Sequence, residues 1–441
     1  MMGREKIYQD DWKYSLAKPW ACWAVTHSYR KCQTHGEENI PTDGALLLAA
    51  NHCNTLMDAL VILRAYKKQT VFGARADIFN KPLIAKFMFF ARILPMVRQR
   101  DGLRNVLKNK DTQESIVETL ENNVRFCMYP EGTHRAKHSL QGLGKGVFRA
   151  ALAANEKFGT EKPVYIVPIG IEYGDYFRYR STSLVNYGKP INVTEFVKDL
   201  DLENEAQVME ALRKELSTRM PELFTYFKYD ENYEPKWALT KMVAIRDRKK
   251  GYGDFGTDLY EDMLRNRQIA SDIEAAMEAH PEEMAELLNE VKAFEIKRKK
   301  SGISIYSFKK KSHPVMNVIG KGFAALLGLP YFLYSAATNL PLWATSFFVR
   351  GKVRDKAFRN TVSFGVKLAM TTLLLPIYAA LAFCFAPWWL ALALLVLWLP
   401  GYSYFHDYIE GCRRWFSDIK LLRNRKLWKS FKSIVKKYTN I

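Results

Sequence analysis

The sequence predicts an α/β fold followed by a C-terminal helical membrane region. Between Gly44 and about Tyr226, short apolar runs alternate with amphipathic ones, which is typical of a sheet layered with helices. Two later stretches, Gly322–Val349 and Leu368–Phe405, contain no charged residue. The chain has 441 residues, so more than one structural unit is expected.

Composition indicates a membrane partner. The formal net charge of +20 requires an anionic partner, and the 10 Trp and 23 Tyr together with the uncharged stretches favour membrane lipids and argue against nucleic acid. The six cysteines are scattered, without a C-x-x-C pair or a histidine at zinc-ligand spacing. They are typical of reduced, cytoplasmic cysteines, and we expect no metal.

The N-terminal segment, residues 1–43, mixes aromatic and basic side chains. Between residues 10 and 35, Trp and Tyr are interleaved with Lys and Arg, which suits helices at a bilayer interface, although an ordinary packing helix fits equally well. The first eighteen residues are too polar for a secretory signal. We expect this segment to stay in the cytoplasm.

Residues 44–226 contain the predicted α/β domain. The helices expected within it include Lys81–Ile93, Gly146–Phe158 and Asn204–Met220. The predicted strands are the runs ALLLAAN, TVFGARA, ILPMVRQ, VRFCMYP, VYIVPIGIEY and TSLVNYGKPI.

Residues 227–311 form a charged helical segment, and residues 312–441 form membrane-associated helices with a basic tail. The 38 residues of Leu368–Phe405 would extend about 57 Å as one helix, nearly twice the hydrocarbon thickness, so a hairpin turning near Ala386–Pro387 is expected. Pro330 and Pro341 should break the Gly322–Val349 stretch. Basic residues flank both stretches, so their ends should remain cytoplasmic.

The polar string after the first strand is the first candidate for chemistry. If ALLLAA is a buried strand, His52 lies in the loop at its end, Asn54 or Thr55 caps the next helix, and Asp58 lies near the first helical turn. Asp58 can then accept a hydrogen bond from one imidazole nitrogen of His52 and leave the other to accept a proton from an alcohol. The alternative is a capping histidine with an aspartate that satisfies the helix N-terminus.

Three further motifs follow in order. The segment Pro95–Arg100 ends an apolar run with Arg98 and Arg100, which are suited to gripping a phosphate. Tyr129–Arg135 places a carboxylate, flexible backbone and a guanidinium at a strand end, where α/β proteins build sites. Val167-Pro168-Ile169 lies within a later strand.

This ordered set resembles the four motifs of the glycerophospholipid acyltransferases, the family of lysophosphatidate and glycerol-3-phosphate acyltransferases, over about Ala45 to Pro190. The resemblance implies a mixed sheet flanked by helices, with the catalytic domain on the cytoplasmic face of a membrane. It implies His52 as general base and Asp58 as its orienting partner. It also assigns Arg98 to the acceptor phosphate, and Glu131, Gly132 and Thr133 to the glycerol phosphate pocket.

Two features depart from the commoner family pattern. Five residues separate His52 from Asp58 where four are usual, which is similar to the branch that includes fungal glycerol-3-phosphate acyltransferases. The third motif reads Glu-Gly-Thr-His-Arg, so either His134 or Arg135 stands for the family arginine. We favour Arg135, because a permanent cation binds phosphate independently of pH.

The expected reaction is acyl transfer from acyl-CoA or acyl-carrier protein, as co-substrate and without a cofactor, to glycerol 3-phosphate or its 1-acyl form in phospholipid biosynthesis. Another lysolipid acceptor, such as an amino-acid lipid, and a non-catalytic membrane scaffold of the same fold remain alternatives. A Cys53–His52 nucleophile is disfavoured, because strand neighbours point to opposite faces. The remaining histidines, including His138, are expected at the surface or at an interface.

Overall fold

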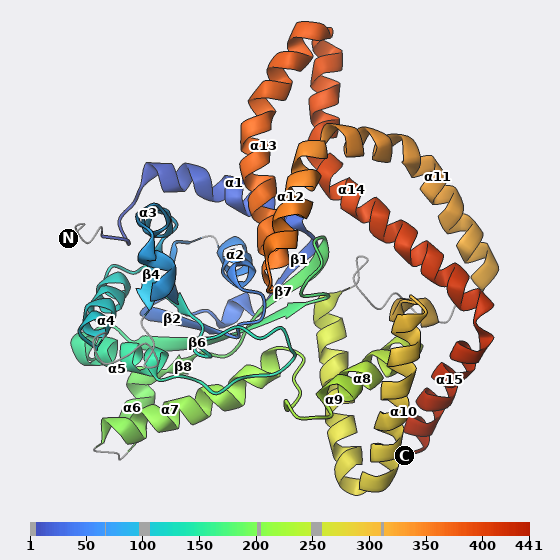
Figure 1. Cartoon of the computed structure of the whole chain (residues 1–441). Helices are drawn as coiled ribbons and strands as arrows, with labels where there is room; N and C mark the ends of the chain where they lie inside the picture. The colour runs from blue at the N-terminus through green and yellow to red at the C-terminus, as the bar shows by residue number, and fades with distance from the viewer. Residues whose placement is uncertain (1–5, 67, 97–105, 201–203, 248–257, 310–312) are drawn as a thin grey trace. The chain divides into compact units, whose positions relative to one another are not determined.

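The computed structural model describes residues 6–66, 68–96, 106–200, 204–247, 258–309 and 313–441, with side chains left out for 106–111. The chain divides into two compact units (Figure 1). The first consists of Met1–Val25, Cys32–Glu172 and Ser183–Phe224, and the second consists of Thr26–Lys31, Tyr173–Thr182 and Thr225–Ile441.

A mixed sheet flanked by helices organises the N-terminal half of the chain. The strand order is β1-β7-β6-β2-β5-β3-β4, with β8 antiparallel to β6. The strands are β1 (Tyr29–His35), β2 (Ala45–Ala50), β3 (Thr70–Arg75), β4 (Ile93–Met96), β5 (Arg125–Met128), β6 (Val164–Tyr173), β7 (Ser181–Tyr187) and β8 (Ile191–Asn192). The helices are α1 (Trp12–Ser28), α2 (Leu56–Ala65), α3 (Pro82–Phe90), α4 (Val106–Glu121), α5 (Gly146–Phe158), α6 (Val193–Asp199) and α7 (Glu205–Arg219), with 3-10 turns at Glu37–Asn39, Ala76–Asn80 and Met220–Leu223.

Strand β2 lies in the middle of this sheet. It runs parallel to β5 on one side and to β6 on the other, so that Leu47 is level with Phe126 and with Ile166. All six of its residues are buried, as a strand with neighbours on both edges and helices on both faces requires. Because parallel strands end at the same edge of a sheet, the segments after β2 and β5 meet there.

The predicted α/β layering is confirmed, with one correction at the N-terminus. Residues 29–35, expected within interfacial helices, form strand β1 at the edge of the sheet. Within the segment YRKCQTH, Tyr29 and Thr34 favour extended backbone. Arg30 and Lys31 on an edge strand also disfavour pairing with another chain.

Glycine is required at position 170 of β6, because the backbone of Leu223 packs closely against it. A larger side chain at this position should therefore destabilise the fold. A Cβ at this position would lie 2.6 Å from the carbonyl carbon of Leu223. We expect Gly170→Ala to lower the free energy of unfolding by about 1–3 kcal/mol, the usual cost of overpacking. Thermal unfolding in detergent measures this. Gly146→Ala, where a Cβ meets nothing within 4 Å, is the control, and an equal loss in both variants would contradict the prediction.

A helical bundle makes up part of the second unit. Its helices are α8 (Tyr233–Asp247), α9 (Leu259–Ala279), α10 (Pro281–Lys300) and α15 (Arg425–Asn440), with a 3-10 turn at Ile305–Phe308. On α15, Leu427, Phe431 and Ile434 pack into a shared core with Leu287 and Val291 of α10. The basic tail is therefore an amphipathic helix whose apolar face is covered.

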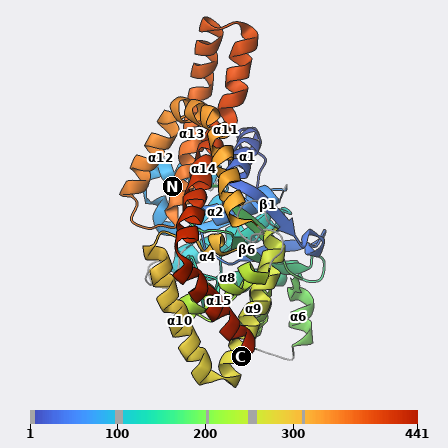
Figure 2. The same ribbon diagram turned by 90° about the vertical axis from the view of Figure 1, so that its right-hand side faces the viewer.

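Within the described part of the second unit, three helices are long and apolar enough to cross a membrane: Pro314–Thr338, Phe358–Phe385 and Trp388–Arg423. They are α11, α13 and α14, and the shorter α12 (Leu340–Lys352) lies between the first two. Figure 2 shows α13 and α14 as a long hairpin. Its turn at Ala386–Pro387 is where the sequence predicts it. The predicted break at Pro330 is wrong, because this proline lies inside α11. The predicted break next to Pro341 is confirmed, because α11 ends before Asn339 and α12 begins after it.

Helix α11 runs antiparallel to α14 and stops short of the hairpin tip. The hydroxyls of Tyr408, Tyr404 and Tyr334 bond the carbonyls of Ala325, Gly328 and Leu394 at 2.9, 3.0 and 2.7 Å. The carbonyl of Thr338, the last residue of α11, accepts from Nε1 of Trp398 at 3.3 Å, and Trp398 lies ten residues after Trp388, roughly 15 Å along α14 from the tip. Helix α12 then turns back beside α13 (Figure 1). This geometry suits a segment that enters and leaves a membrane by one face.

This arrangement predicts which residues an impermeant thiol reagent reaches in intact cells. Single cysteines are placed at Lys356, Pro387 and Thr439 in a background without the natural cysteines, since Cys384 near the tip is exposed. Only Pro387→Cys should be labelled from outside. The other two should react after permeabilisation, because basic loops stay cytoplasmic. Labelling of Lys356→Cys from outside would mean that α11 crosses the membrane without returning.

Candidate active site

The first candidate pair is brought together at the carboxyl edge of the sheet. His52 follows β2, Asp58 lies in the first turn of α2, and the imidazole Nδ1 is 2.8 Å from Oδ2 of Asp58. Asp58 is fully buried, whereas the His52 side chain is 18% exposed. The carboxylate is therefore shielded from water while the imidazole remains accessible to a substrate.

Asp58 also shapes the loop that carries His52. Its Oδ2 accepts hydrogen bonds from the backbone N–H groups of Cys53 at 2.9 Å and Asn54 at 2.7 Å. Thr55 occupies the N-cap position of α2, one of the two positions expected, but at φ 50° and without a side-chain cap hydrogen bond. The aspartate reaches back to the preceding N–H groups instead, and this draws the loop around it.

Glu131 connects the His52 loop to the loop after β5. Its Oε1 accepts from the backbone N–H of His52 at 2.8 Å and its Oε2 from that of Gln141 at 2.9 Å. Burial raises the pKa of the Glu131 carboxyl, and the hydrogen bonds from His52 and Gln141 offset part of this rise. Glu131 therefore takes up a proton at a higher pH than an ordinary glutamate, and these bonds to its ionised form weaken there.

The rest of the third motif surrounds the His52 ring. Tyr129 stacks on it with ring centroids 4.3 Å apart, and His134 lies edge-on at 5.7 Å. The backbone N–H of Arg135 donates to the carbonyl of His52 at 2.9 Å, and its guanidinium donates to Leu140 at 3.4 Å.

Gly132 and Thr133 form the exposed turn of this loop. Gly132 has φ 68°, which glycine adopts without strain. The carbonyl of Thr133 accepts from the side chain of Gln141 at 2.8 Å. The loop is thereby held from both ends, by Glu131 and by Gln141, beside the His52 ring.

Cys53 is not set up as a nucleophile. Burial, and then the charge of Asp58, raises the pKa of its thiol well above the ordinary value. Its Sγ donates to Oδ1 of Asp58 at 3.6 Å. The thiol therefore stays protonated, and the thiolate that nucleophilic catalysis needs is disfavoured.

A second histidine–carboxylate pair lies in the same unit. Nδ1 of His138 is 3.2 Å from Oε1 of Glu172, and both side chains are almost fully buried. The expected placement of His138 at the surface or at an interface is wrong, because Glu172 at the end of β6 partners it inside the protein. The pair is 34 residues apart in the chain, so local spacing could not reveal it. Tyr129 was also assigned no role, although an aromatic residue directly before the Pro-Glu-Gly turn was a usable signal.

One predicted site residue is not placed. Arg98 lies outside the described residues. Within the ranges that the structure describes, there is no group of three His, Cys, Asp or Glu side chains that could hold a metal ion.

Comparison with known proteins supports an acyltransferase domain. Residues 31–172, which include the His52–Asp58 pair and the Glu131 loop, match the model of the family described as Acyltransferase. No curated protein matches the chain. Among solved structures, the 1-acyl-sn-glycerophosphate (LPA) acyltransferase PlsC from Thermotoga maritima is similar, with a TM-score of 0.33 and 19% identity over 46% of this chain and 78% of that chain. The family match supports a general acyltransferase activity.

Proposed function

We propose that the protein is an O-acyltransferase that moves a fatty acyl group from acyl-CoA or acyl-carrier protein to the hydroxyl of 1-acyl-glycerol-3-phosphate or glycerol 3-phosphate, in the synthesis of phosphatidic acid. The observation that carries this proposal is the 2.8 Å contact between Nδ1 of His52 and Asp58 in a region that matches the acyltransferase family. The order of the four sequence motifs supports the glycerol phosphate acceptor.

In the proposed mechanism, Asp58 fixes the tautomer of His52. Because the carboxylate accepts at Nδ1, the imidazole carries its proton there and Nε2 presents a lone pair. Nε2 takes the proton of the acceptor hydroxyl as its oxygen attacks the thioester carbonyl. An ester C–O bond forms, the C–S bond breaks, and the thiolate takes the proton from His52. No covalent enzyme intermediate is required.

The membrane setting supports a lipid acceptor. Among the residues that the structure describes, three helices are long and apolar enough to cross a bilayer, and ten Lys or Arg residues lie from Arg413 to Lys437. Both acyl donors are made in the cytoplasm, so we place the catalytic domain on that face of the membrane.

The test is a labelled acyl-transfer assay with purified full-length protein. Glycerol 3-phosphate and its 1-acyl derivative are offered separately, each with acyl-CoA and with acyl-carrier protein. We expect ester formation with one or both of these acceptors. Transfer only to a lysolipid without a phosphate, or no transfer to any acceptor, would overturn the proposal.

Arg98 provides a separate prediction about the acceptor. Arg98→Ala should raise KM for the phosphorylated acceptor about ten- to a hundredfold and leave KM for the thioester nearly unchanged, because a charge-assisted contact with phosphate contributes about 1.5–3 kcal/mol. Steady-state kinetics with each substrate varied in turn measures this. An equal rise in both KM values would remove Arg98 from the acceptor site.

A further inference from the structure

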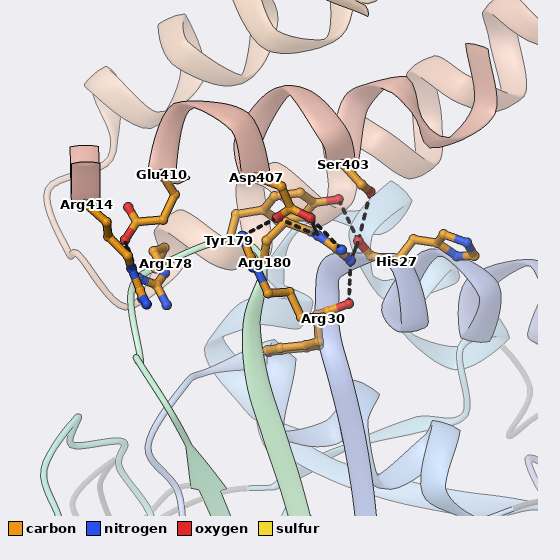
Figure 3. Close-up of polar contacts among 10 residues, drawn as sticks. His27, Arg30, Arg178, Tyr179, Arg180, Ser403, Asp407, Glu410 and Arg414 are labelled. Atoms are coloured by element: carbon orange, nitrogen blue, oxygen red, sulfur yellow. Dashed lines mark hydrogen bonds and ion pairs between the residues drawn. The ribbon is translucent and has the colours of Figure 1, made fainter. Parts of the chain in front are cut away.

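Two carboxylates on one face of α14 hold a group of arginines (Figure 3). Asp407 accepts from Nη2 of Arg180 at 2.8 Å and pairs with Nη2 of Arg30 at 2.9 Å. One turn further along α14, Oε1 of Glu410 accepts from Nη1 of Arg178 at 2.8 Å and from Nε of Arg414 at 3.0 Å. We call these six residues the arginine cluster. Each carboxylate is thus shared by two guanidiniums.

The arginine cluster gathers three segments of the second unit. Arg30 belongs to Thr26–Lys31, Arg178 and Arg180 belong to Tyr173–Thr182, and the others lie on α14. Arg180 also donates to the carbonyls of His27 at 3.2 Å and Tyr29 at 2.6 Å. These fixed contacts hold the guanidiniums in place. The six side chains are only 14–25% exposed, yet each remains reachable from solvent.

Positive charge exceeds negative charge in the arginine cluster, with four guanidiniums against two carboxylates. The excess positive charge affects the pKa of the Arg30 guanidinium. Burial is the main cause that lowers this pKa to about 10, the charges of the other three arginines add to the decrease, and Asp407 opposes it. Lys367 of α13 adds a further amine nearby, with its Nζ 3.2 Å from Oγ of Ser403, which donates to the carbonyl of His27. A bound anion would relieve this repulsion.

The distance of the arginine cluster from the apolar tip of the hairpin indicates the source of such an anion. Asp407 lies 19 residues after Trp388, the first residue of α14 at the apolar tip, which is roughly 28 Å along the helix. Lys367 lies 18 residues before Phe385, roughly 27 Å from the same tip. Both values are close to the hydrocarbon thickness of about 30 Å. Counted from the hairpin tip, Lys367 on α13 and Asp407 on α14 are the first charged residues, and both therefore lie at the level of lipid phosphates.

We propose that the arginine cluster binds the phosphate of an anionic glycerophospholipid from the leaflet on that side. Guanidiniums suit this ligand, because their planar fork of N–H donors matches two phosphate oxygens and is weakly hydrated. Arg178 and Arg414 carry the contact, since both guanidiniums meet at the Glu410 carboxylate on this face of α14. Arg180 instead spends its donors on Asp407 and the backbone.

The experiment measures binding of a fluorescent phosphatidylglycerol to the purified full-length protein in micelles that contain phosphatidylcholine. Phosphatidylglycerol is neither the acceptor nor the product of the proposed reaction, so the result does not depend on that function. Arg178→Gln leaves Glu410 paired with Arg414, and Arg414→Gln leaves it paired with Arg178, so both variants should fold. Thermal unfolding verifies this for each. Lys437→Gln removes the same charge from a lysine that pairs with Glu290 in the bundle, and is the matched control.

We expect each arginine variant to weaken phosphatidylglycerol binding about tenfold, as loss of one charge-assisted contact predicts, while Lys437→Gln stays within about twofold of the unmodified protein. Equal affinity in the arginine variants and the unmodified protein would overturn the proposal. Displacement by excess phosphatidylcholine would show that the lipid is held by its acyl chains alone. Displacement by millimolar inorganic phosphate would show a site for free phosphate. Either displacement contradicts a site for an anionic lipid.

Discussion

His52→Ala should reduce acyl transfer by about 10²- to 10⁴-fold, the usual contribution of a general base. In the unmodified protein the His52 imidazole is held from two sides, by the hydrogen bond to Asp58 at 2.8 Å and by the stacked ring of Tyr129. Alanine removes the lone pair that accepts the hydroxyl proton. The backbone N–H of residue 52 still donates to Glu131, so the loop keeps its main tether.

The measurement is the initial rate of labelled acyl transfer at saturating donor and acceptor, with protein in the same detergent. The loss should appear in kcat, because proton transfer contributes in the transition state and not in substrate binding. His280→Ala, at a histidine that is 47% exposed on the helical bundle, is the control and should leave the rate unchanged. More than a tenth of the normal rate in His52→Ala would exclude His52 as the essential base. Unchanged thermal unfolding would separate lost chemistry from lost structure.

The central part of the fold follows from patterns that sequence alone carries. Parallel strands that are buried on both faces consist of nearly continuous apolar residues. The runs ALLLAA and VYIVPIGIEY have this pattern, and both form buried strands. The hairpin turn at Ala386–Pro387 follows from the length of an uncharged stretch against the thickness of a bilayer. Both predictions depend on solvent exclusion, which averages over many residues.

The predictions that failed depend on single residues and their distant partners. Pro330 does not end α11, because tyrosines of α14 donate to backbone carbonyls of α11 near the proline, such as Tyr404 to the carbonyl of Gly328 at 3.0 Å. Strand β1 needed an edge to pair with, and only the assembled sheet supplies it. His138 and Glu172 meet through tertiary structure, so no local spacing marks them.

The candidate site divides in the same way. That His52 and Asp58 meet could be predicted, because a strand end and the first turn of the next helix are local neighbours. The two hydrogen bonds of Glu131 could not be predicted. Its carboxylate oxygens accept from backbone N–H groups in two different loops, and packing sets how those loops align. The position of Glu131 favours a role in holding the His52 loop, in addition to any contact with substrate.

Asp58→Asn should lower kcat by roughly 10²-fold, within the range for loss of general acid–base assistance, with little change in either KM. The Oδ2 atom accepts from His52 Nδ1 and from two backbone N–H groups, whereas Oδ1 faces the Cys53 thiol. An amide oxygen can take the place of Oδ2, so the asparagine retains the shape of the site and removes only the negative charge. That charge stabilises the imidazolium formed when His52 takes up the proton, and without it the proton transfer is slower. Asp58→Ala is the comparison: it leaves buried donors unpaired, at about 1–3 kcal/mol each, and should lower thermal stability as well as rate. If Asp58→Asn keeps the rate within about threefold of normal while unfolding normally, the charge of Asp58 does not assist His52, and its role is confined to shaping the loop.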